Sequence, residues 1–526
     1  MSRSREFVVN KPSVIGVIKM EQPFVLIVGA GPTGLALAHR LTHYNIPFRI
    51  IDKRPGPDHK SRAIGIHART LEHYDQLQVA DDAVNLGIKM PAAHIHKETK
   101  EVGYVNLGNI GKGISPFPFV LSLPQDEHEE LLVHQLKRLG ITVDWQTELL
   151  SFKETSEGVE AVVACDHQEE TVNVTYLCGC DGARSMIRQT LDISFEGSTY
   201  KDLFYIADVE AKGQATSFTD INLALSKKGF CMVLPVKSKG TQRLVGIVPR
   251  LIAEKPDLSF WDIEPSLQSL MNIRVKNVNW FSSFKVHKRV AATFRKGHVF
   301  LLGDAAHIHS PTGAQGMNTG IGDAVNLSWK LASVLKKNAN PAILHTYGLE
   351  RRKFARQLVA TTDQAFKAMV SRNIRGSLLR KFVLPRMVPV ASRFSFSRKL
   401  AFRYLSQIHV RYRKSVLSEG RAGSLKGGDR LPWLHSNSIN NYDSLQTADW
   451  QIHVYGKPTE ELESFCRDYP LPLFSWDWEP EYKKAKFKEN TLYLVRPDGH
   501  LAFINEHQNV DKLMTYLTTF NVSAIN

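Results

Sequence analysis

The stretch GDAAHIHSPTGAQGMN, residues 303–318, contains side chains that could bind a metal ion. Asp304, His307 and His309 place one carboxylate and two imidazoles within six residues, a donor set that suits a first-row transition metal. The glycines that follow allow a second interpretation, in which a turn and a helix start bring backbone amides close to an anionic cofactor. The two interpretations predict different chemistry, and the elements around the stretch must decide between them.

A G-x-G-x-x-G motif lies near the N-terminus. Its residues are Gly29, Gly31, Pro32, Thr33 and Gly34. The apolar runs FVLIV (24–28) and FRIID (48–52) flank a helix-compatible stretch, so the segment predicts a βαβ unit. Asp52 ends the second run, where an acid can bond a ribose hydroxyl, and Lys53 follows near the adenosine end. We therefore predict that this unit binds a dinucleotide, although the glycines alone do not separate NAD(P) from FAD.

Two later segments repeat a pattern in which an acid and a glycine follow a predicted strand. CDGARSMIR (180–188) comes after the run VTYLCG, and the 303–318 stretch comes after the run HVFLL. Each places a carboxylate and a flexible turn at the end of a strand, the edge at which open parallel sheets bind their ligands.

With these segments in order, the sequence resembles the single-component FAD-dependent aromatic hydroxylases. The resemblance is dense over about residues 21–365 and rests on the three glycine motifs, SRAIGIHARTLE (61–72) and TYGLERR (346–352). It returns at GGDRLP (427–432) and YLVRPDGHLAFI (493–504), which look like the linker and the thioredoxin-like C-terminal domain of the phenol hydroxylase branch.

The resemblance implies FAD as the cofactor, NAD(P)H as the co-substrate, and specific site residues. Beyond the first motif, the residues that it places at the cofactor are Arg62, Gln125, Asp181, Gly182, Arg184, Gly303, Asp304, Pro311, Gly313, Gly316, Met317 and Asn318. Arg62 and Pro311 would act beside the reacting ring, and Asp304 would hold two ribityl hydroxyls. Arg184 and Arg188 would meet the nicotinamide donor, or would be surface arginines after a strand–turn–helix.

The helix expected from about Met317 would direct its positive end at the N1–C2=O edge of the flavin, which becomes anionic on reduction. Gly313 and Gly316 would leave room for the ring. We therefore favour the cofactor interpretation of residues 303–318, with His307 and His309 as turn residues and no metal.

The reaction implied is hydroxylation of a phenolic ring by NAD(P)H and O2 through a C4a-hydroperoxyflavin. Substrate contacts are expected from residues 195–290 and near Pro311, and the sequence does not identify the base that deprotonates the substrate; His287 is as well explained as a surface histidine. A flavin reductase of isoprenoid-type double bonds and a non-catalytic flavin-binding regulator are the alternatives.

The predicted fold is α/β, with a Rossmann-type FAD-binding domain, an inserted substrate-binding β-sheet domain and a C-terminal thioredoxin-like domain. Helices are expected at 125–139, 262–272 and 316–336, and a small antiparallel sheet at 143–176. The predicted domain ranges are 1–20 (a loose extension, with Met20 as an alternative start), 21–195 (FAD-binding, first part, with some substrate-domain strands), 196–290 (substrate-binding), 291–365 (FAD-binding, second part), 366–432 (basic helical segment and linker) and 433–526 (thioredoxin-like).

The composition indicates the cellular environment in which the protein works. Its 526 residues are 43% hydrophobic, with no apolar run of the length a membrane span needs and no signal-peptide core. Five cysteines, an odd number, indicate reduced thiols and a cytoplasmic protein. The C-terminal domain lacks C-x-x-C, so we expect a structural role for it, including homodimer formation.

The net charge of +15 is concentrated in one segment. Residues 351–430 hold 20 Lys and Arg against three acids. Within it, 377–405 mixes bases with aromatic and aliphatic residues, which allows solvated helices, a peripheral contact with an anionic membrane, or, least favoured, nucleic-acid binding. No nucleic-acid module is recognisable, so we expect none to bind.

Overall fold

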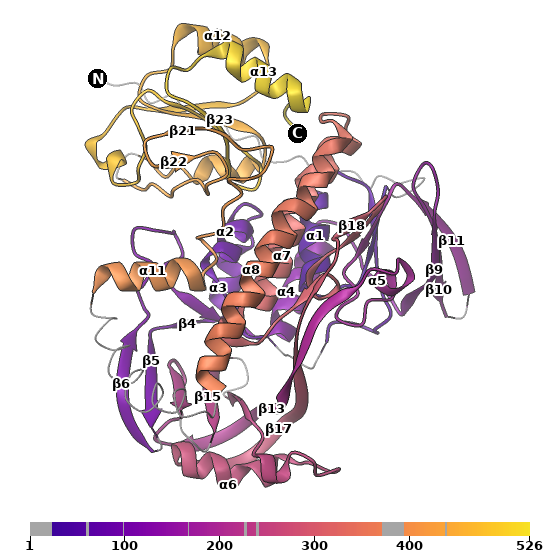
Figure 1. Cartoon of the computed structure of the whole chain (residues 1–526), viewed down its shortest axis with the longest axis vertical. Coiled ribbons are helices and arrows are strands. Elements are labelled where there is room, and N and C mark those ends of the chain that lie inside the picture. The colour runs from indigo at the N-terminus through magenta and orange to yellow at the C-terminus, as the bar shows by residue number, and fades with distance from the viewer. Residues whose placement is uncertain are drawn as a thin grey trace.

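A computed structural model describes residues 24–58, 63–97, 99–166, 168–225, 229–237, 241–370, 394–436 and 439–525. Figure 1 shows the C-terminal residues as a separate layer above the rest, with the long helices α7 and α8 below it. These helices are Gln315–Leu335 and His345–Val370. In the described residues, no helix is both long and apolar enough to cross a membrane.

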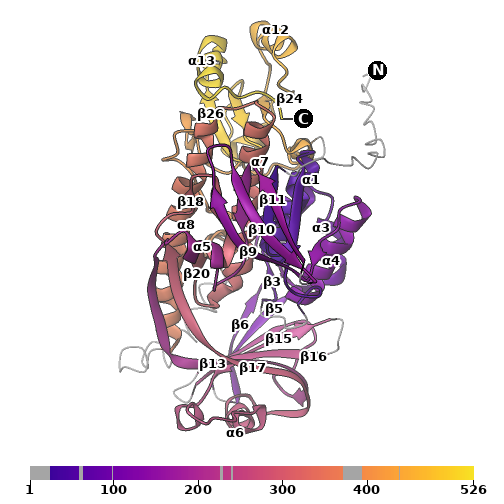
Figure 2. The same ribbon diagram turned by 90° about the vertical axis from the view of Figure 1, so that its right-hand side faces the viewer.

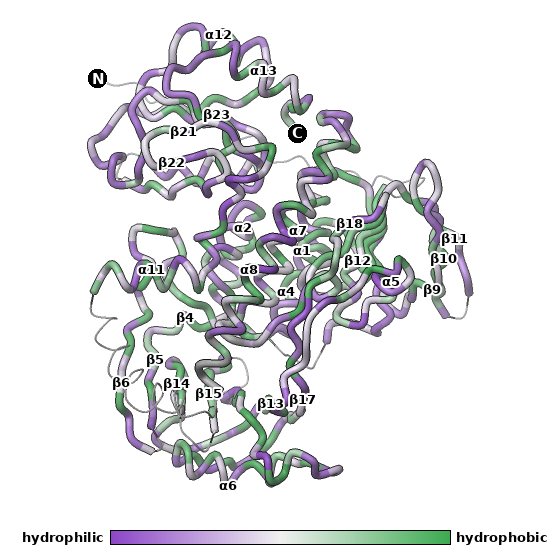
Figure 3. Tube along the Cα trace, in the orientation of Figure 1, coloured by the Kyte–Doolittle hydropathy of each residue, from purple (hydrophilic) through white to green (hydrophobic). Residues whose placement is uncertain are grey.

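The first sheet has six strands and carries the predicted βαβ unit. In spatial order its strands are β18 (Arg295–Lys296), β19 (Val299–Leu301), β12 (Tyr176–Gly179), β1 (Val25–Val28), β2 (Phe48–Asp52) and β8 (Asp144–Trp145). β1 lies parallel to both β2 and β12, and β12 lies parallel to β19. Most of their apolar residues are buried, and the region near α1 and β12 is mostly hydrophobic in Figure 3. The Rossmann-type prediction is confirmed, because all three glycine motifs follow neighbouring parallel strands.

Helices cover this sheet. α1 (Pro32–His43) packs against α7 and against α4 (Gln125–Arg138), so the predicted helices at 125–139 and 316–336 are confirmed. α5 (Met186–Thr190) follows the second glycine motif. The predicted antiparallel sheet is also present, as β9 (Thr147–Glu154), β10 (Val159–Cys165) and β11 (Gln168–Val174).

The middle of the chain forms an eight-stranded sheet. Its order is β20 (His307–Ile308), β17 (Ile273–Ala291), β13 (Phe195–Gly213), β16 (Thr241–Ile247), β15 (Phe230–Val236), β14 (Ile221–Leu225), β5 (Ala92–Lys97) and β6 (Lys100–Asn106). Figure 2 shows β13 and β17 running together toward α6 (Phe260–Met271), the helix predicted at 262–272. β5 and β6 come from the first part of the chain, as expected for substrate-domain strands there.

The C-terminal residues form a second α/β layer. Its sheet has the order β22 (Leu425–Lys426), β21 (Glu419–Ala422), β26 (Leu501–Asn505), β25 (Leu492–Val495), β23 (Gln451–Tyr455) and β24 (Leu473–Trp476). The helices α12 (Glu460–Asp468) and α13 (Val510–Phe520) pack against each other. The layer shares its core with the helices of the first sheet, since buried Trp450 meets buried Trp329 of α7 edge to face at 5.4 Å. The thioredoxin-like assignment and the domain ranges stay predictions.

Candidate functional site

In the first glycine motif, two glycines are required by the packing of the fold and one leaves room for a ligand. Gly29 has φ +105°, and a Cβ on it would lie 2.4 Å from the carbonyl oxygen of Cys180. A Cβ on Gly34 would lie 1.9 Å from the carbonyl oxygen of Gly29. At Gly31, by contrast, nothing lies within 4 Å of a Cβ position, and α1 begins there with Pro32 and without a side-chain cap. The open second glycine and the uncapped helix start suit a pyrophosphate.

Thr33 connects this turn to the third motif. The Cβ positions of Gly303 and Gly320 lie 2.6 and 2.2 Å from Thr33 Oγ1, so both glycines allow close approach. α1, α7 and the turn at Gly303 are thereby packed around one hydroxyl.

Asp52 lies at the end of β2, as predicted, and is 8% exposed. Its Oδ2 accepts hydrogen bonds from the amide of Ala30 (2.7 Å) and from Arg54 Nη2 (3.0 Å). These contacts hold the carboxylate against the first turn. Lys53 is at the surface, where its Nζ lies 3.2 Å from Glu148 Oε1.

The second motif contains a carboxylate oxygen without a protein partner. Asp181 Oδ2 accepts from the amide of Ile187 at 3.1 Å, whereas its Oδ1 is buried and has no hydrogen-bond partner among the described residues. Burial raises the pKa of Asp181 despite the hydrogen bonds it receives. An unpaired buried oxygen is costly, so this atom points to a ligand that donates to it. Gly182 beside it has φ +77° and open space at its Cβ position.

The two arginines of this segment differ. Arg184 is exposed. Arg188 is 5% exposed, and its guanidinium donates to the carbonyl oxygens of Ala305 (2.8 Å) and Ala183 (3.0 Å). Arg188 therefore ties the second motif to the third and leaves only Arg184 accessible to a co-substrate.

Asp323 of α7 holds the third motif in place. Its Oδ2 accepts from the amide of Gly303 (3.1 Å) and from His307 Nε2 (2.7 Å), and its Oδ1 accepts from Arg351 Nε (2.6 Å). Burial alone would raise the pKa of Asp323, but the charges of Arg351 and His307 bring it below its usual value. Asp304 is exposed between buried neighbours. His307 is thus committed to a structural hydrogen bond, and the described residues contain no cluster of three His, Cys, Asp or Glu side chains suited to a metal.

The turn before α7 adopts left-handed backbone. Gly313 has φ +74° and Ala314 has φ +53°, and Ala314 precedes α7 without a side-chain cap. Pro311 and Gly313 are exposed, and Gly316 and Met317 are half-buried. Among the described residues, the amides of the first helical turn therefore have no side-chain cap, which fits the predicted contact with an anionic cofactor edge.

Asn318 is buried and uses its whole amide within the protein. Its Oδ1 accepts from the amide of His67 (2.9 Å) and from Thr70 Oγ1 (2.7 Å). Its Nδ2 donates to the carbonyl oxygens of Gly65 and Ala314, both at 2.9 Å. The contact of Asn318 with the cofactor stays a prediction, while its side chain holds the turn through four protein partners.

His309 offers a hydrogen-bond acceptor beside this turn. Its Nδ1 lies 2.8 Å from the carbonyl oxygen of Ser310, so Nδ1 carries the proton and Nε2 is the bare nitrogen. Nε2 is buried without a hydrogen-bond partner in the described part of the chain, 3.8 Å from the Cβ position of Gly316. Burial lowers the pKa of His309 to about 4, so the ring is neutral at pH 7.

Arg62, the predicted catalytic residue, lies outside the described residues. Gln125 supports the chain next to it, since its backbone amide donates to the carbonyl of Ala63 (3.0 Å) and its Oε1 accepts from the amide of Ala63 (3.3 Å). Gln125 Nε2 also donates to Glu129 Oε1 at 2.8 Å.

We call the turns at 29–34, 181–182, 303–304 and 311–316 the cofactor cradle. Its parts meet through the contacts of Gly29 with Cys180, Thr33 with Gly303 and Arg188 with Ala305. The open Gly31, the unpaired oxygen of Asp181 and the uncapped start of α7 fit FAD, which would place its pyrophosphate, ribityl chain and flavin ring along these turns in that order.

Sequence reasoning missed the residues behind the cradle, although the TYGLERR stretch contained three of them. Tyr347 donates to the carbonyl oxygen of Leu301 at 2.7 Å, at the end of β19. Glu350 accepts from Arg496 Nη1 (2.8 Å) and from Lys330 Nζ (2.9 Å). The stretch resembled a family motif, but without a structure its side chains had no visible partners.

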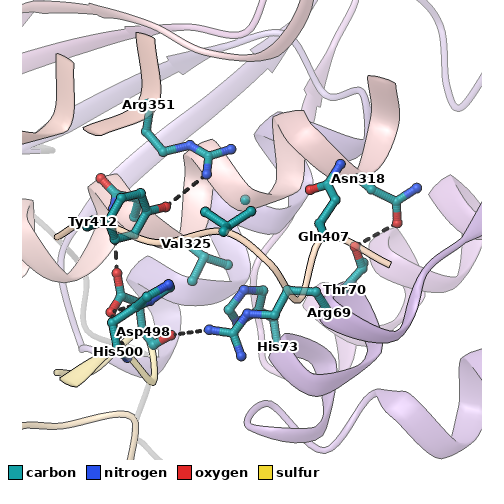
Figure 4. A pocket seen from close by; sticks show the side chains of 13 residues that line it. Arg69, Thr70, His73, Asn318, Val325, Arg351, Gln407, Tyr412, Asp498 and His500 are labelled. Carbon is teal, nitrogen blue, oxygen red and sulfur yellow. Dashed lines mark hydrogen bonds and ion pairs between the residues drawn. The ribbon is translucent and has the colours of Figure 1, made fainter. Parts of the chain in front are cut away.

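These charges belong to a larger group that we call the charged seam, between α2 (Ala68–Asp75), α7, α8 and the turn from β25 to β26. Its members are Arg69, Glu72, Lys330, Glu350, Arg430, Arg496 and Asp498. All seven are 9% exposed or less. Figure 4 shows part of it around a cavity of about 20 Å³, which has room for a water molecule.

The chain is similar to known proteins in both sequence and structure. The model of the FAD binding domain family matches residues 23–362. A flavin-dependent monooxygenase of Mycobacteroides abscessus is 29% identical over 92% of this chain and 97% of its own length. Pentachlorophenol 4-monooxygenase of Sphingobium chlorophenolicum is 29% identical over 93% of this chain and 88% of its own. The solved structure of OxyS anhydrotetracycline hydroxylase from Streptomyces rimosus superposes with a TM-score of 0.75 at 25% identity, covering 94% of this chain and 98% of that one.

Proposed function

This chain belongs to the FAD binding domain family, among the flavin-dependent aromatic hydroxylases, and we propose that it hydroxylates a phenolic ring with NAD(P)H and O2. The observation that carries the proposal is the cofactor cradle, in which three strand ends and the start of α7 present open amides and an unpaired carboxylate oxygen to one ligand. The relatives support an aromatic substrate, because one of them acts on pentachlorophenol and another on anhydrotetracycline.

The residues of this chain bind and orient, while bound FAD supplies the oxidation chemistry: hydride acceptance and activation of O2. The amides at Gly31 would hold the pyrophosphate, Asp304 the ribityl hydroxyls, and the first turn of α7 the anionic edge of the reduced ring. Arg184, exposed at the second motif, would meet the nicotinamide donor, and Arg62 would lie beside the ring.

The substrate side of the site is the eight-stranded sheet. Its edge strand β20 carries His307 and ends three residues before Pro311, where the last turn of the cradle begins. A ring held on this sheet would therefore lie next to the flavin, away from bulk water, as oxygen transfer requires. The bare Nε2 of His309 is an acceptor within this region.

The test is a screen of phenolic ligands that follows NADH and NADPH consumption, with the product mass measured. A hydroxylase gives ligand-stimulated oxidation and a product heavier by one oxygen atom. A product heavier by two hydrogens would identify a flavin reductase, and no turnover with any aromatic ligand would favour the regulator.

We also propose that the enzyme is cytoplasmic and touches anionic membranes through α11 (Ser395–Leu405), the described part of the 377–405 segment. Residues 377–393 lie outside the described residues. Phe396, Leu400 and Tyr404 recur every four residues and are 76%, 44% and 56% exposed. The helix contains two Arg and one Lys and no acid, which complements anionic lipid.

Co-sedimentation with phosphatidylserine vesicles at low and high salt tests this contact. We expect pelleting at low salt that is lost at high salt and in a Phe396→Ser, Leu400→Ser variant. Equal recovery in the supernatant with neutral and anionic vesicles at low salt would rule it out.

A further inference from the structure

We propose that Gln407 is a positioning residue for the flavin: it fixes the first turn of α7 from outside the FAD-binding domain. Gln407 lies between α11 and the C-terminal layer, beyond the region 23–362 that matches the family. The inference rests on FAD binding by the cradle but not on the identity of the substrate.

The side chain of Gln407 is 5% exposed and holds the beginning of α7 by several hydrogen bonds. Its Nε2 donates to Gln315 Oε1 (2.7 Å) and to Thr319 Oγ1 (2.9 Å), and it lies 3.3 Å from the carbonyl oxygen of Gln315. Gln315 returns a bond, because its Nε2 donates to the carbonyl oxygen of Leu405 at 2.6 Å. The chain before and after Gln407 is therefore joined to the first residue of the helix.

The backbone is left-handed on both sides of this contact, which indicates that surrounding contacts hold it in that conformation. Gln407 has φ +59° and Ala314, immediately before α7, has φ +53°. Residues with a Cβ seldom adopt the left-handed region, and they stay there only where surrounding contacts over-determine the conformation. Two such residues facing each other across one set of hydrogen bonds suit a site that must be preorganised.

The position of this turn matters for the cofactor. The amides that follow Ala314 have no side-chain cap and point out of the positive end of α7. Reduced flavin carries its negative charge on the ring edge that this end would face, so a turn held in place favours the reduced form over the oxidised form. Without the hydrogen bonds of Gln407, α7 would still form, but the amides of its first turn would point in a wider range of directions.

Figure 4 shows that the contact is not isolated, since Gln407 and Asn318 lie on the same side of the cavity. Asn318 of α7 links Thr70 of α2 to the carbonyl oxygen of Ala314 in the turn. Tyr412 accepts from Arg351 Nη1 at 2.9 Å, and Arg351 in turn contacts Asp323, which binds the amide of Gly303. Gln407 is the member of this set that reaches the helix start from the segment leading to the C-terminal layer.

The test compares Gln407→Asn with Gln508→Asn. Asn tolerates left-handed backbone but is one methylene shorter, so it loses the bonds without adding backbone strain. Gln508 is the matched control: it has φ +50°, is 3% exposed, and its Nε2 donates to the carbonyl oxygens of Lys457 and Asn490, both at 2.9 Å. It lies in the C-terminal layer, away from α7.

The measurement is the two-electron midpoint potential of bound FAD in each holoenzyme, together with the thermal unfolding midpoint. We expect Gln407→Asn to lower the preference for reduced over oxidised flavin about tenfold, which is a potential about 30 mV more negative. Gln508→Asn should keep the wild-type potential even if it unfolds at a lower temperature. No substrate is needed, so failure of the hydroxylation assay would not affect the result.

A Gln407→Asn holoenzyme with the wild-type potential would overturn the proposal, because a merely structural residue changes unfolding and not the potential. If that variant does not fold, Thr319→Val removes one acceptor of Gln407 while keeping the shape of the side chain. It should move the potential in the same direction, and an unchanged potential in this variant would overturn the proposal equally.

Discussion

The cofactor cradle and the charged seam both surround α7, but they treat polar groups in opposite ways. In the cradle, Asp181 Oδ1 is buried without a hydrogen-bond partner among the described residues, and so is His309 Nε2 beside it. In the seam, Glu350 and Asp498 are equally buried and share the guanidinium of Arg496. Unpaired buried groups are costly, so the cradle is built for a ligand that completes it, whereas the seam is complete in itself.

Two buried histidines beside the seam, His73 and His500, keep ring nitrogens without hydrogen-bond partners among the described residues. In His500 these are Nδ1, which is 3.3 Å from Asp498 Oδ1 without hydrogen-bond geometry, and Nε2. Both rings line the cavity of about 20 Å³, where a water molecule can bond one ring nitrogen. These unpaired nitrogens therefore do not indicate a binding site for a larger ligand.

Breaking the seam should have the largest effect on stability. Glu350→Ala leaves Arg496 and Lys330 buried without their shared carboxylate, which costs about 3–5 kcal/mol in the free energy of unfolding. The exposed pair of Arg356 with Glu196, at 3.7 Å, provides the control, and Glu196→Ala should cost less than about 1 kcal/mol. Urea unfolding of the holoenzymes measures both, and similar midpoints for the two variants would contradict a stabilising seam.

Acid should destabilise the fold through buried histidines before it reaches the carboxylates. Burial lowers the pKa of His39 and of His67 to about 4 and of His128 to about 3. A lowered folded-state pKa contributes stability that is present above the unfolded value of about 6.5 and is lost as pH falls toward the folded value. Each such group can contribute about 3 kcal/mol, so unfolding midpoints should fall steeply from pH 6.5 to 4.

The variant His128→Gln tests this assignment, because glutamine keeps a polar group near Tyr74 Oη, which lies 2.7 Å from His128 Nε2, but does not titrate. Its stability should change less between pH 6.5 and 4 than that of the wild type. A pH profile parallel to the wild type would assign the acid sensitivity to other groups.

A substitution at Asp304 tests whether the cradle binds FAD. Asp304→Ala should weaken FAD binding by about 1.5–3 kcal/mol, roughly ten- to a hundredfold, because the proposed contact gives two ribityl hydroxyls a charged acceptor. Asp304 is exposed, so the substitution opens no cavity in the core, and the unfolding midpoint of the apoprotein is measured beside the affinity. FAD titration by fluorescence measures the affinity, with Asp468→Ala, an exposed acid at the end of α12, as the control. Unchanged affinity would remove Asp304 from the site.

Gly31 and Gly34 separate ligand space from packing within a single motif. Gly34→Ala forces a Cβ to within 1.9 Å of a backbone oxygen and should destabilise the apoprotein by at least about 1–3 kcal/mol. Gly31→Ala meets no protein atom within 4 Å, so its apoprotein should keep its stability while losing affinity for FAD. Apoprotein unfolding and FAD titration of both variants decide this, and equal loss of stability in both would mean that Gly31 also serves the fold.

The sequence predicts features that depend on neighbouring residues better than contacts between residues far apart in the chain. The βαβ unit, the helix at 315–335 and the three strand-end turns were predictable, because apolar period and glycine spacing are local signals. The partners of Asp323 and Gln407 were not predictable, since Arg351 and Gln315 come from distant positions and nothing in residue type identifies which buried amide meets which. Asn318 illustrates both: its place in the turn was predicted, but its four protein partners were not.

The smallest expected effect concerns the pattern that first suggested a metal site. His307 gives Nε2 to Asp323, and His309 gives Nδ1 to the carbonyl of Ser310, so different partners orient the two rings, and we expect them to share no ion with Asp304. Incubation with EDTA followed by gel filtration should therefore leave FAD content and NAD(P)H oxidation unchanged. His307→Asn, in contrast, should lower stability by about 1–3 kcal/mol, because Asp323 loses a buried donor. Loss of activity on chelation, restored by a divalent metal, would reverse the assignment and return residues 304–309 to metal binding.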